Sequence, residues 1–89
     1  MALSEVMKAL SDPTRREILN ILKKGSLTAS EIGSHFLISA PAISKHLAIL
    51  LDAELVRCRR EGKYLYYELC ASVLEEVLLW LKDLKEDEK

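Results

Sequence analysis

Two groups of residues in this chain have side chains suited to binding chemistry. The segment 39–46 combines short side chains with Lys45 and His46, which can donate hydrogen bonds to base edges or to phosphates. A second group is cationic, because residues 57–63 contain four Lys or Arg residues and only one acidic residue, Glu61. Nucleic-acid phosphates attract such cations. Both groups therefore favour a nucleic-acid partner.

Other chemistry is poorly supported. Two cysteines, Cys58 and Cys70, are too few for a disulfide framework and lack metal-site spacing, so we expect ordinary reduced thiols. A thiol or persulfide switch that uses both cysteines remains an alternative. The chain has no nucleophile elbow, glycine-rich phosphate loop or paired carboxylates, so we expect no enzyme.

Composition and charge limit the function classes further. Of the 89 residues, 49% are hydrophobic, which is enough for one small domain but marginal for a monomer, so we expect a partner chain. No stretch approaches the roughly 20 apolar residues of a membrane span, and the start lacks a secretory signal, which favours the cytoplasm. The net charge is −1, with ten Lys/Arg and eight Asp/Glu in residues 1–70 (+2) and three and six in residues 71–89 (−3). The acidic excess is therefore confined to the C-terminal end.

The segment 39–51 is predicted to be a helix that presents the candidate binding residues. Ser39 is a suitable N-cap, and Pro41 fits the first helical turn. Apolar residues recur behind them at helical spacing, which predicts one core-facing side and nearly bare first turns. His46 lies on the flank, where it would either contact DNA or make a structural hydrogen bond.

Three helices are predicted before this one. Residues 2–10 have apolar residues at i, i+3, i+4 and i+7. Asp12 is the expected N-cap of a second helix over 13–24, which Gly25 ends. Thr28 and a glutamate three residues later form a capping box that starts a third, short helix through residue 36. A tight turn at residues 37–38 then leads to Ser39, as in a helix-turn-helix.

A β-hairpin is predicted after these helices. Alternating residues in 55–60 and 63–69 flank a turn at Glu61 and Gly62. One face is expected to carry Val56, Cys58, Leu65 and Tyr67, and the other Arg57, Arg59, Tyr64 and Tyr66. The fold class is therefore mainly α with a small β-hairpin: four helices, two strands and a last helix, arranged as a winged helix-turn-helix.

The last helix, residues 71–85, has an apolar stripe too wide for a monomer surface. Together with the stripe of residues 2–10 it predicts a two-fold homodimer. We therefore expect one domain over residues 1–85 and an acidic, frayed tail over 86–89. The expected interface residues are Leu3, Val6, Met7, Leu10, Val73, Leu74, Val77, Leu78, Trp80 and Leu81.

Three segments identify a family resemblance. The run Ala9–Leu19 (ALSDPTRREIL), the run Ala42–Leu47 (AISKHL) and the hairpin segment 61–67 (EGKYLYY) resemble the ArsR/SmtB family of bacterial transcriptional repressors. The resemblance spans nearly the whole chain and implies a winged-helix dimer that binds a DNA operator and represses transcription. The two-fold symmetry expected of the dimer predicts that this operator is palindromic.

The resemblance does not extend to the family's metal sites. Arsenic- and cadmium-sensing members have cysteines where this chain has Leu27–Ser30, and zinc- and nickel-sensing members use histidine on the last helix, which this chain lacks. Carboxylates without imidazole make a poor transition-metal site. We therefore expect no metal and no other cofactor, as in the metal-independent autorepressors, and a regulatory protein as one means of relieving repression.

These observations define the expected DNA-binding surface. The helix would enter the major groove, while the hairpin would hold phosphates or enter the adjacent minor groove. Alternatives are a thiol-responsive repressor and a winged-helix module that binds protein. The residues expected at the DNA are Ser39, Ala40, Pro41, Ala42, Ser44, Lys45, His46, Arg57, Arg59, Arg60, Lys63 and Tyr64.

Overall fold

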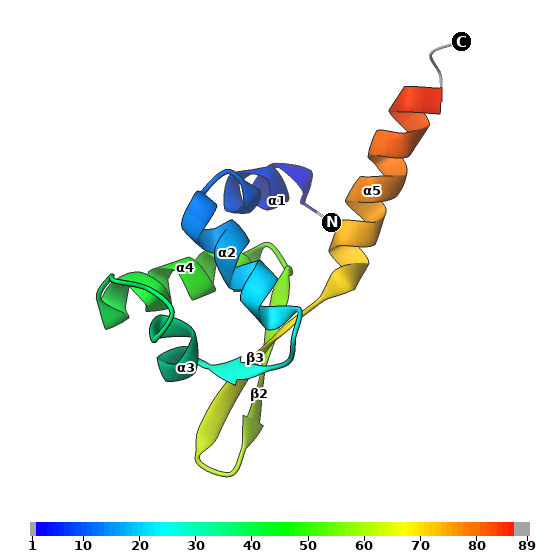
Figure 1. Cartoon of the computed structure of the whole chain (residues 1–89). Helices are drawn as coiled ribbons and strands as arrows, with labels where there is room; N and C mark the ends of the chain where they lie inside the picture. Colours follow the sequence, from blue (N-terminus) through cyan, green and yellow to red (C-terminus); the bar gives the residue numbers. More distant parts are fainter. Residues whose placement is uncertain (1, 87–89) are drawn as a thin grey trace.

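The computed structural model describes residues 2–86, which form five helices and a three-stranded antiparallel sheet (Figure 1). The predicted class, a mainly helical winged helix-turn-helix with a β-hairpin, is confirmed. The elements are α1 (Leu3–Leu10), α2 (Pro13–Leu22), β1 (Leu27–Thr28), α3 (Ala29–Gly33), α4 (Ala40–Asp52), β2 (Val56–Glu61), β3 (Tyr64–Leu69) and α5 (Ala71–Glu86).

The predicted helix starts are confirmed by their capping hydrogen bonds. The carboxylate of Asp12 accepts from the backbone N–H of Arg15 at 3.0 Å, and this bond is the main cause that holds the pKa of Asp12 below its usual value. Thr28 and Glu31 form the capping box, with bonds of 3.1 Å and 2.9 Å. Beyond the end of α2, Gly25 has a φ of +145°, which favours glycine.

The helix α3 is shorter than predicted. It ends at Gly33, whereas the capping box and apolar spacing predicted a helix through Phe36. The Ser34 hydroxyl donates to the Glu31 carbonyl at 2.6 Å, and the N–H of Phe36 bonds to Gly33, three residues back rather than four. A serine side chain that competes for a helix carbonyl favours such an end. The connection to α4 is therefore longer than the predicted turn.

The sheet contains one strand that was not predicted. Its order is β1-β3-β2, and β1 pairs with β3 through Leu27 and Tyr67. The hairpin faces are confirmed, because Cys58 lies opposite Tyr67, and Arg59 lies opposite Tyr66 on the other face. A two-residue strand is too short for an alternating pattern to reveal, so the predicted element order was incomplete.

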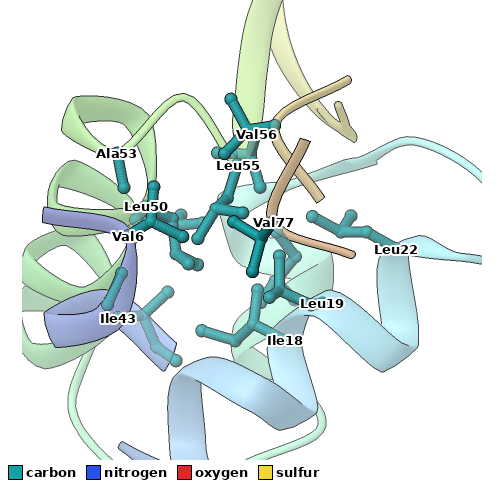
Figure 2. Packing of buried hydrophobic residues seen from close by; sticks show 14 residues of the cluster. Val6, Ile18, Leu19, Leu22, Ile43, Leu50, Ala53, Leu55, Val56 and Val77 are labelled. Carbon is teal, nitrogen blue, oxygen red and sulfur yellow. The ribbon is translucent and has the colours of Figure 1, made fainter. Parts of the chain in front are cut away.

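A single apolar core joins the helices to the base of the hairpin (Figure 2). Helices α1, α2 and α4 contribute most of it, and α5 contributes from its first turns. Burial of these side chains fixes how α4 is presented. The core consists of Val6, Ala9, Ile18, Leu19, Leu22, Ile32, Ile43, Leu47, Leu50, Ala53, Leu55, Val56, Val73 and Val77.

Beyond its first turns, α5 projects away from the body of the molecule (Figure 1). Every residue from 78 to 86 is exposed. Within the described residues, no helix is both long and apolar enough to cross a membrane. Of the acidic tail predicted over 86–89, Glu86 ends α5 and residues 87–89 lie outside the described residues.

The end of α4 provides a stability prediction. Glu54 follows the helix with a φ of +62°, and the N–H of Leu55 bonds to the carbonyl of Leu50 at 3.0 Å. This position favours glycine because a side chain there costs about 1 kcal/mol. We expect Glu54→Gly to raise the free energy of unfolding by about 1 kcal/mol.

The measurement is urea unfolding at one protein concentration. Glu17→Gly, at an exposed position inside α2, is the matched control and should lower the free energy of unfolding by about 1 kcal/mol. If the urea concentration at the unfolding midpoint of Glu54→Gly is at or below that of the unsubstituted protein, the backbone at residue 54 is not strained and the prediction is wrong.

Candidate nucleic-acid interface

The helix α4 is buried on one side and open on the other. The Ser39 hydroxyl accepts from the N–H of Ala42 at 3.2 Å and caps the helix, while Ile43, Leu47 and Leu50 are buried in the core. The first two turns thus present short side chains and one cation to solvent. Of the residues predicted to contact DNA here, Ser39, Ala40, Pro41, Ser44 and Lys45 are exposed, and Ala42 and His46 are half-buried.

Arg15 links three helices. It is the one charged side chain that is buried among residues 2–86. Its Nε donates to the carbonyl of Ala9 at 2.9 Å, its Nη2 donates to the carbonyl of Lys8 at 3.0 Å, and its Nη1 lies 3.2 Å from Nδ1 of His46. A guanidinium cannot accept hydrogen bonds, so Nδ1 of His46 is the acceptor. His46 therefore makes the structural hydrogen bond that was one of its two predicted roles.

Arg15 was not among the predicted site residues. Its position offered a signal, because Arg15, Ile18, Leu19 and Leu22 have the i, i+3, i+4, i+7 spacing of a buried helix face. A cation at a buried position requires hydrogen-bond acceptors. The sequence does not reveal that these include His46, which is 31 residues away.

Two of the arginines predicted to bind phosphate, on β2, already donate hydrogen bonds to one carboxylate on β3. Glu68 accepts from Nε of Arg57 at 2.7 Å and from Nε of Arg59 at 3.3 Å, and these bonds hold the pKa of Glu68 below its usual value. Arg59 also lies 3.3 Å from the carboxylate of Glu61 and donates to the Ser26 hydroxyl at 3.1 Å. Both guanidiniums thus have protein partners.

The cations at the hairpin tip are less constrained. Gly62 opens the turn with a φ of +64°, as glycine does in two-residue hairpin turns. The ammonium of Lys63 lies 5.5 Å from the ring centroid of Tyr64. Within residues 2–86, no carboxylate forms a salt bridge with Arg60 or Lys63. The tip projects at one end of the molecule, and α5 projects at the other (Figure 1).

The two thiols are separated along the sheet. Cys58 pairs with Tyr67, whereas the N–H of Cys70 bonds to the carbonyl of Leu55 at 3.0 Å. Cys70 is thus three residues farther along the chain than Tyr67, roughly 10 Å at the rise of a strand. A disulfide requires Cα atoms within about 7 Å. The fold therefore does not bring the two cysteines together for a direct disulfide within one chain.

The predicted dimer residues divide into three groups. Val6, Val73 and Val77 are buried in the core of the single chain, and Figure 2 shows Val6 and Val77 there. They are buried because the first turns of α5 pack onto this core. Leu3, Leu10 and Leu74 are half-buried against the core, whereas Met7, Leu78, Trp80 and Leu81 are exposed.

Comparisons with known sequences agree with this geometry. Residues 12–57, just over half of the chain, match the family described as "Bacterial regulatory protein, arsR family". The chain is 48% identical to Transcriptional repressor SdpR of Bacillus subtilis (strain 168) over 79 residues, which cover 89% of this chain and 88% of that protein. It is 40% identical to the Arsenical resistance operon repressor of Staphylococcus aureus, over 85% of this chain and 73% of that protein.

Solved structures are similar over almost the whole chain. The ArsR family transcriptional regulator RHA00566 matches with a TM-score of 0.88 and 29% identity, over 98% of this chain and 92% of that chain. The homodimeric winged helix-turn-helix DNA-binding domain Mb0332 of Mycobacterium bovis, described as a possible ArsR-family regulator, matches with a TM-score of 0.75 and 25% identity, over 96% and 79%. The family match and these relatives show that the chain belongs to the arsR family of bacterial regulatory proteins.

Proposed function

We propose that this chain is a sequence-specific DNA-binding repressor that acts as a homodimer on a palindromic operator. The main support is the exposed start of α4, whose short side chains let the helix approach a major groove. There Lys45 would donate to a guanine edge, Ser44 would bond to a base or a phosphate, and the methyl group of Ala42 would contact thymine. The similarity to Transcriptional repressor SdpR supports repression rather than activation of transcription.

The hairpin would bind the DNA backbone. Arg60 and Lys63 would neutralise phosphates most directly, because no carboxylate in residues 2–86 pairs with them. Tyr64, at the tip beside Lys63, would contribute its hydroxyl. Arg57 and Arg59 would first have to exchange the carboxylate of Glu68 for a phosphate. This exchange reduces their contribution to the free energy of DNA binding.

The dimer would form through the exposed apolar residues of α1 and α5. Met7, Leu78, Trp80, Leu81 and Leu84 leave a large apolar surface open on a single chain. The homodimeric structure of Mb0332 supports this arrangement. A two-fold axis would place the two α4 helices about 34 Å apart, or a multiple of it, and so require a palindromic operator. In this proposal residues 1–85 act as one domain.

The repressor would act in the cytoplasm without bound metal. Within residues 2–86, no three His, Cys, Asp or Glu side chains form a group that could hold a metal ion. The segment Leu27–Ser30, which carries no cysteine, forms β1 and the start of α3. We propose that a regulatory protein, rather than a metal, relieves repression.

A substitution at Ser44 tests whether α4 reads the base sequence. Ser44→Ala should change the preference among operator variants and leave binding to random DNA nearly unchanged, because a lost base contact affects specific binding only. The measurement is fluorescence anisotropy with DNA from upstream of the gene and with random DNA. Equal losses on both would contradict a base contact by Ser44. An unsubstituted protein that prefers neither DNA would contradict the proposed function.

A substitution at Lys63 tests whether the hairpin tip binds phosphate. Lys63→Ala should weaken binding to all DNA and reduce the slope of log affinity against log salt by about 0.9, the contribution of one phosphate contact. Arg57→Ala is the comparison and should change the slope less, because Glu68 already pairs with Arg57. A larger change from Arg57→Ala would show that the paired arginine, not the tip lysine, binds phosphate.

A substitution at Leu81 tests whether the exposed face of α5 forms the dimer. Leu81→Glu should convert the dimer to a monomer, because it buries a charge in the apolar interface. Leu79 provides the matched control, since it lies about 160° away around the helix and is 66% exposed, so Leu79→Glu should remain dimeric. Sedimentation velocity measures both. A dimer that survives Leu81→Glu would place the interface elsewhere.

A further inference from the structure

The contact between Arg15 and His46 joins the buried centre of the fold to the candidate DNA surface. We propose that Arg15 is a positioning residue for DNA binding: it holds His46 so that Nε2–H donates to a phosphate of the DNA backbone. This inference rests on the proposed function. It specifies which atom of His46 contacts the DNA, and it adds Arg15, a buried residue, as the residue that orients His46.

The hydrogen bond from Arg15 determines the tautomer of the neutral His46 ring. Because Nη1 of Arg15 donates to Nδ1 of His46, a neutral ring carries its proton on Nε2. Within residues 2–86 that nitrogen has no hydrogen-bond partner, and the side chain is only half-buried. His46 therefore offers one N–H donor to a ligand.

The guanidinium of Arg15 is itself held in place. Two further bonds, to the carbonyls of Ala9 and Lys8, fix the guanidinium of Arg15 at the end of α1. A fixed guanidinium prevents the ring of His46 from turning its acceptor nitrogen outward. It also polarises the ring toward a stronger Nε2–H donor. A donor that is already oriented loses less conformational entropy when DNA binds.

The position of His46 on α4 indicates which part of the DNA would accept its hydrogen bond. His46 lies one residue beyond Lys45, about 100° around α4, and so on the flank of the helix rather than on its outermost line. The outermost line of a helix in the major groove faces the base edges, and its flanks face the phosphates that border the groove. The position therefore favours a phosphate oxygen over a base edge.

The test compares variants by fluorescence anisotropy on operator and on random DNA. His46→Ala should lose about tenfold in affinity on both, as expected for one hydrogen bond to a charged group. His46→Gln should retain most of the affinity, because the amide nitrogen of glutamine can occupy the position of Nε2. Arg15→Gln should lower the DNA affinity about as much as His46→Ala does. In a protein that already carries His46→Ala, adding Arg15→Gln should lower the affinity little further.

Arg16→Gln is the matched control. Nη1 of Arg16 also donates to an α1 carbonyl, that of Leu10 at 2.8 Å, but the structure gives it no contact with His46. Its affinity should be unchanged. Equal losses from Arg15→Gln with and without His46 would overturn the proposal, because Arg15 would then act through the fold alone.

An NMR measurement on the unsubstituted protein does not depend on whether the Arg15→Gln variants fold. The imidazole ¹⁵N shifts of the unsubstituted protein should show Nδ1 as acceptor and Nε2 protonated, and the Nε2–H proton should move downfield when DNA binds. Unchanged Nε2–H signals in a DNA complex, or unchanged affinity in His46→Ala, would overturn the inference while leaving the proposed function intact. A protein that binds no DNA would overturn both.

Discussion

The position of α4 depends on the burial of its inner face. Ile43, Leu47 and Leu50 are each at most 2% exposed, and they pack in a cluster that also contains residues of α1, α2, α5 and the base of the hairpin. Apolar burial of this kind contributes about 1.5–3 kcal/mol for each side chain. Because one face is fixed so firmly, the opposite face can be left almost bare without loss of the helix. The surface proposed to enter a groove is thus a consequence of the core behind it.

The charges on the hairpin show how a chain with a net charge of −1 can present a basic surface. Glu68 neutralises the arginines near the base of the hairpin, while the tip retains Arg60 and Lys63. The hairpin tip therefore keeps cations that no carboxylate of residues 2–86 pairs with. Such cations favour association with phosphates, while the acidic excess of the chain lies in residues 71–89.

Local signals predicted much of this structure. The cap at Asp12, the capping box at Thr28, the apolar stripes and the two faces of the hairpin all follow from residues close together in the sequence, and the fold class followed from their order. The hairpin turn lies at Gly62 and Lys63, one residue later than predicted, so Glu61 belongs to β2. The missing features depend on distant residues. Strand β1 is defined by its pairing with β3, and the contact of Arg15 with His46 spans 31 residues.

The apolar stripes of α1 and α5 show the same limit. Periodicity predicts which side of a helix is apolar, but it cannot tell which residues the chain's own core will cover. Val73 and Val77 are covered by the core, whereas Leu78 and Leu81 lie beyond the point where α5 leaves it. The candidate DNA residues of α4 could be located from spacing alone, yet their hydrogen-bond partners could not.

Because of Thr28, the fold should tolerate inserted or deleted residues at some positions and not at others. It pairs with Tyr66 in the sheet, its hydroxyl and its N–H form the capping box of α3, and no residue separates the two elements. An inserted residue there would turn α3 by about 100° relative to the sheet. At the hairpin tip, by contrast, an added residue would extend a solvent-exposed turn. Insertions and deletions among related chains should therefore collect at the tip and be absent from the junction of β1 and α3.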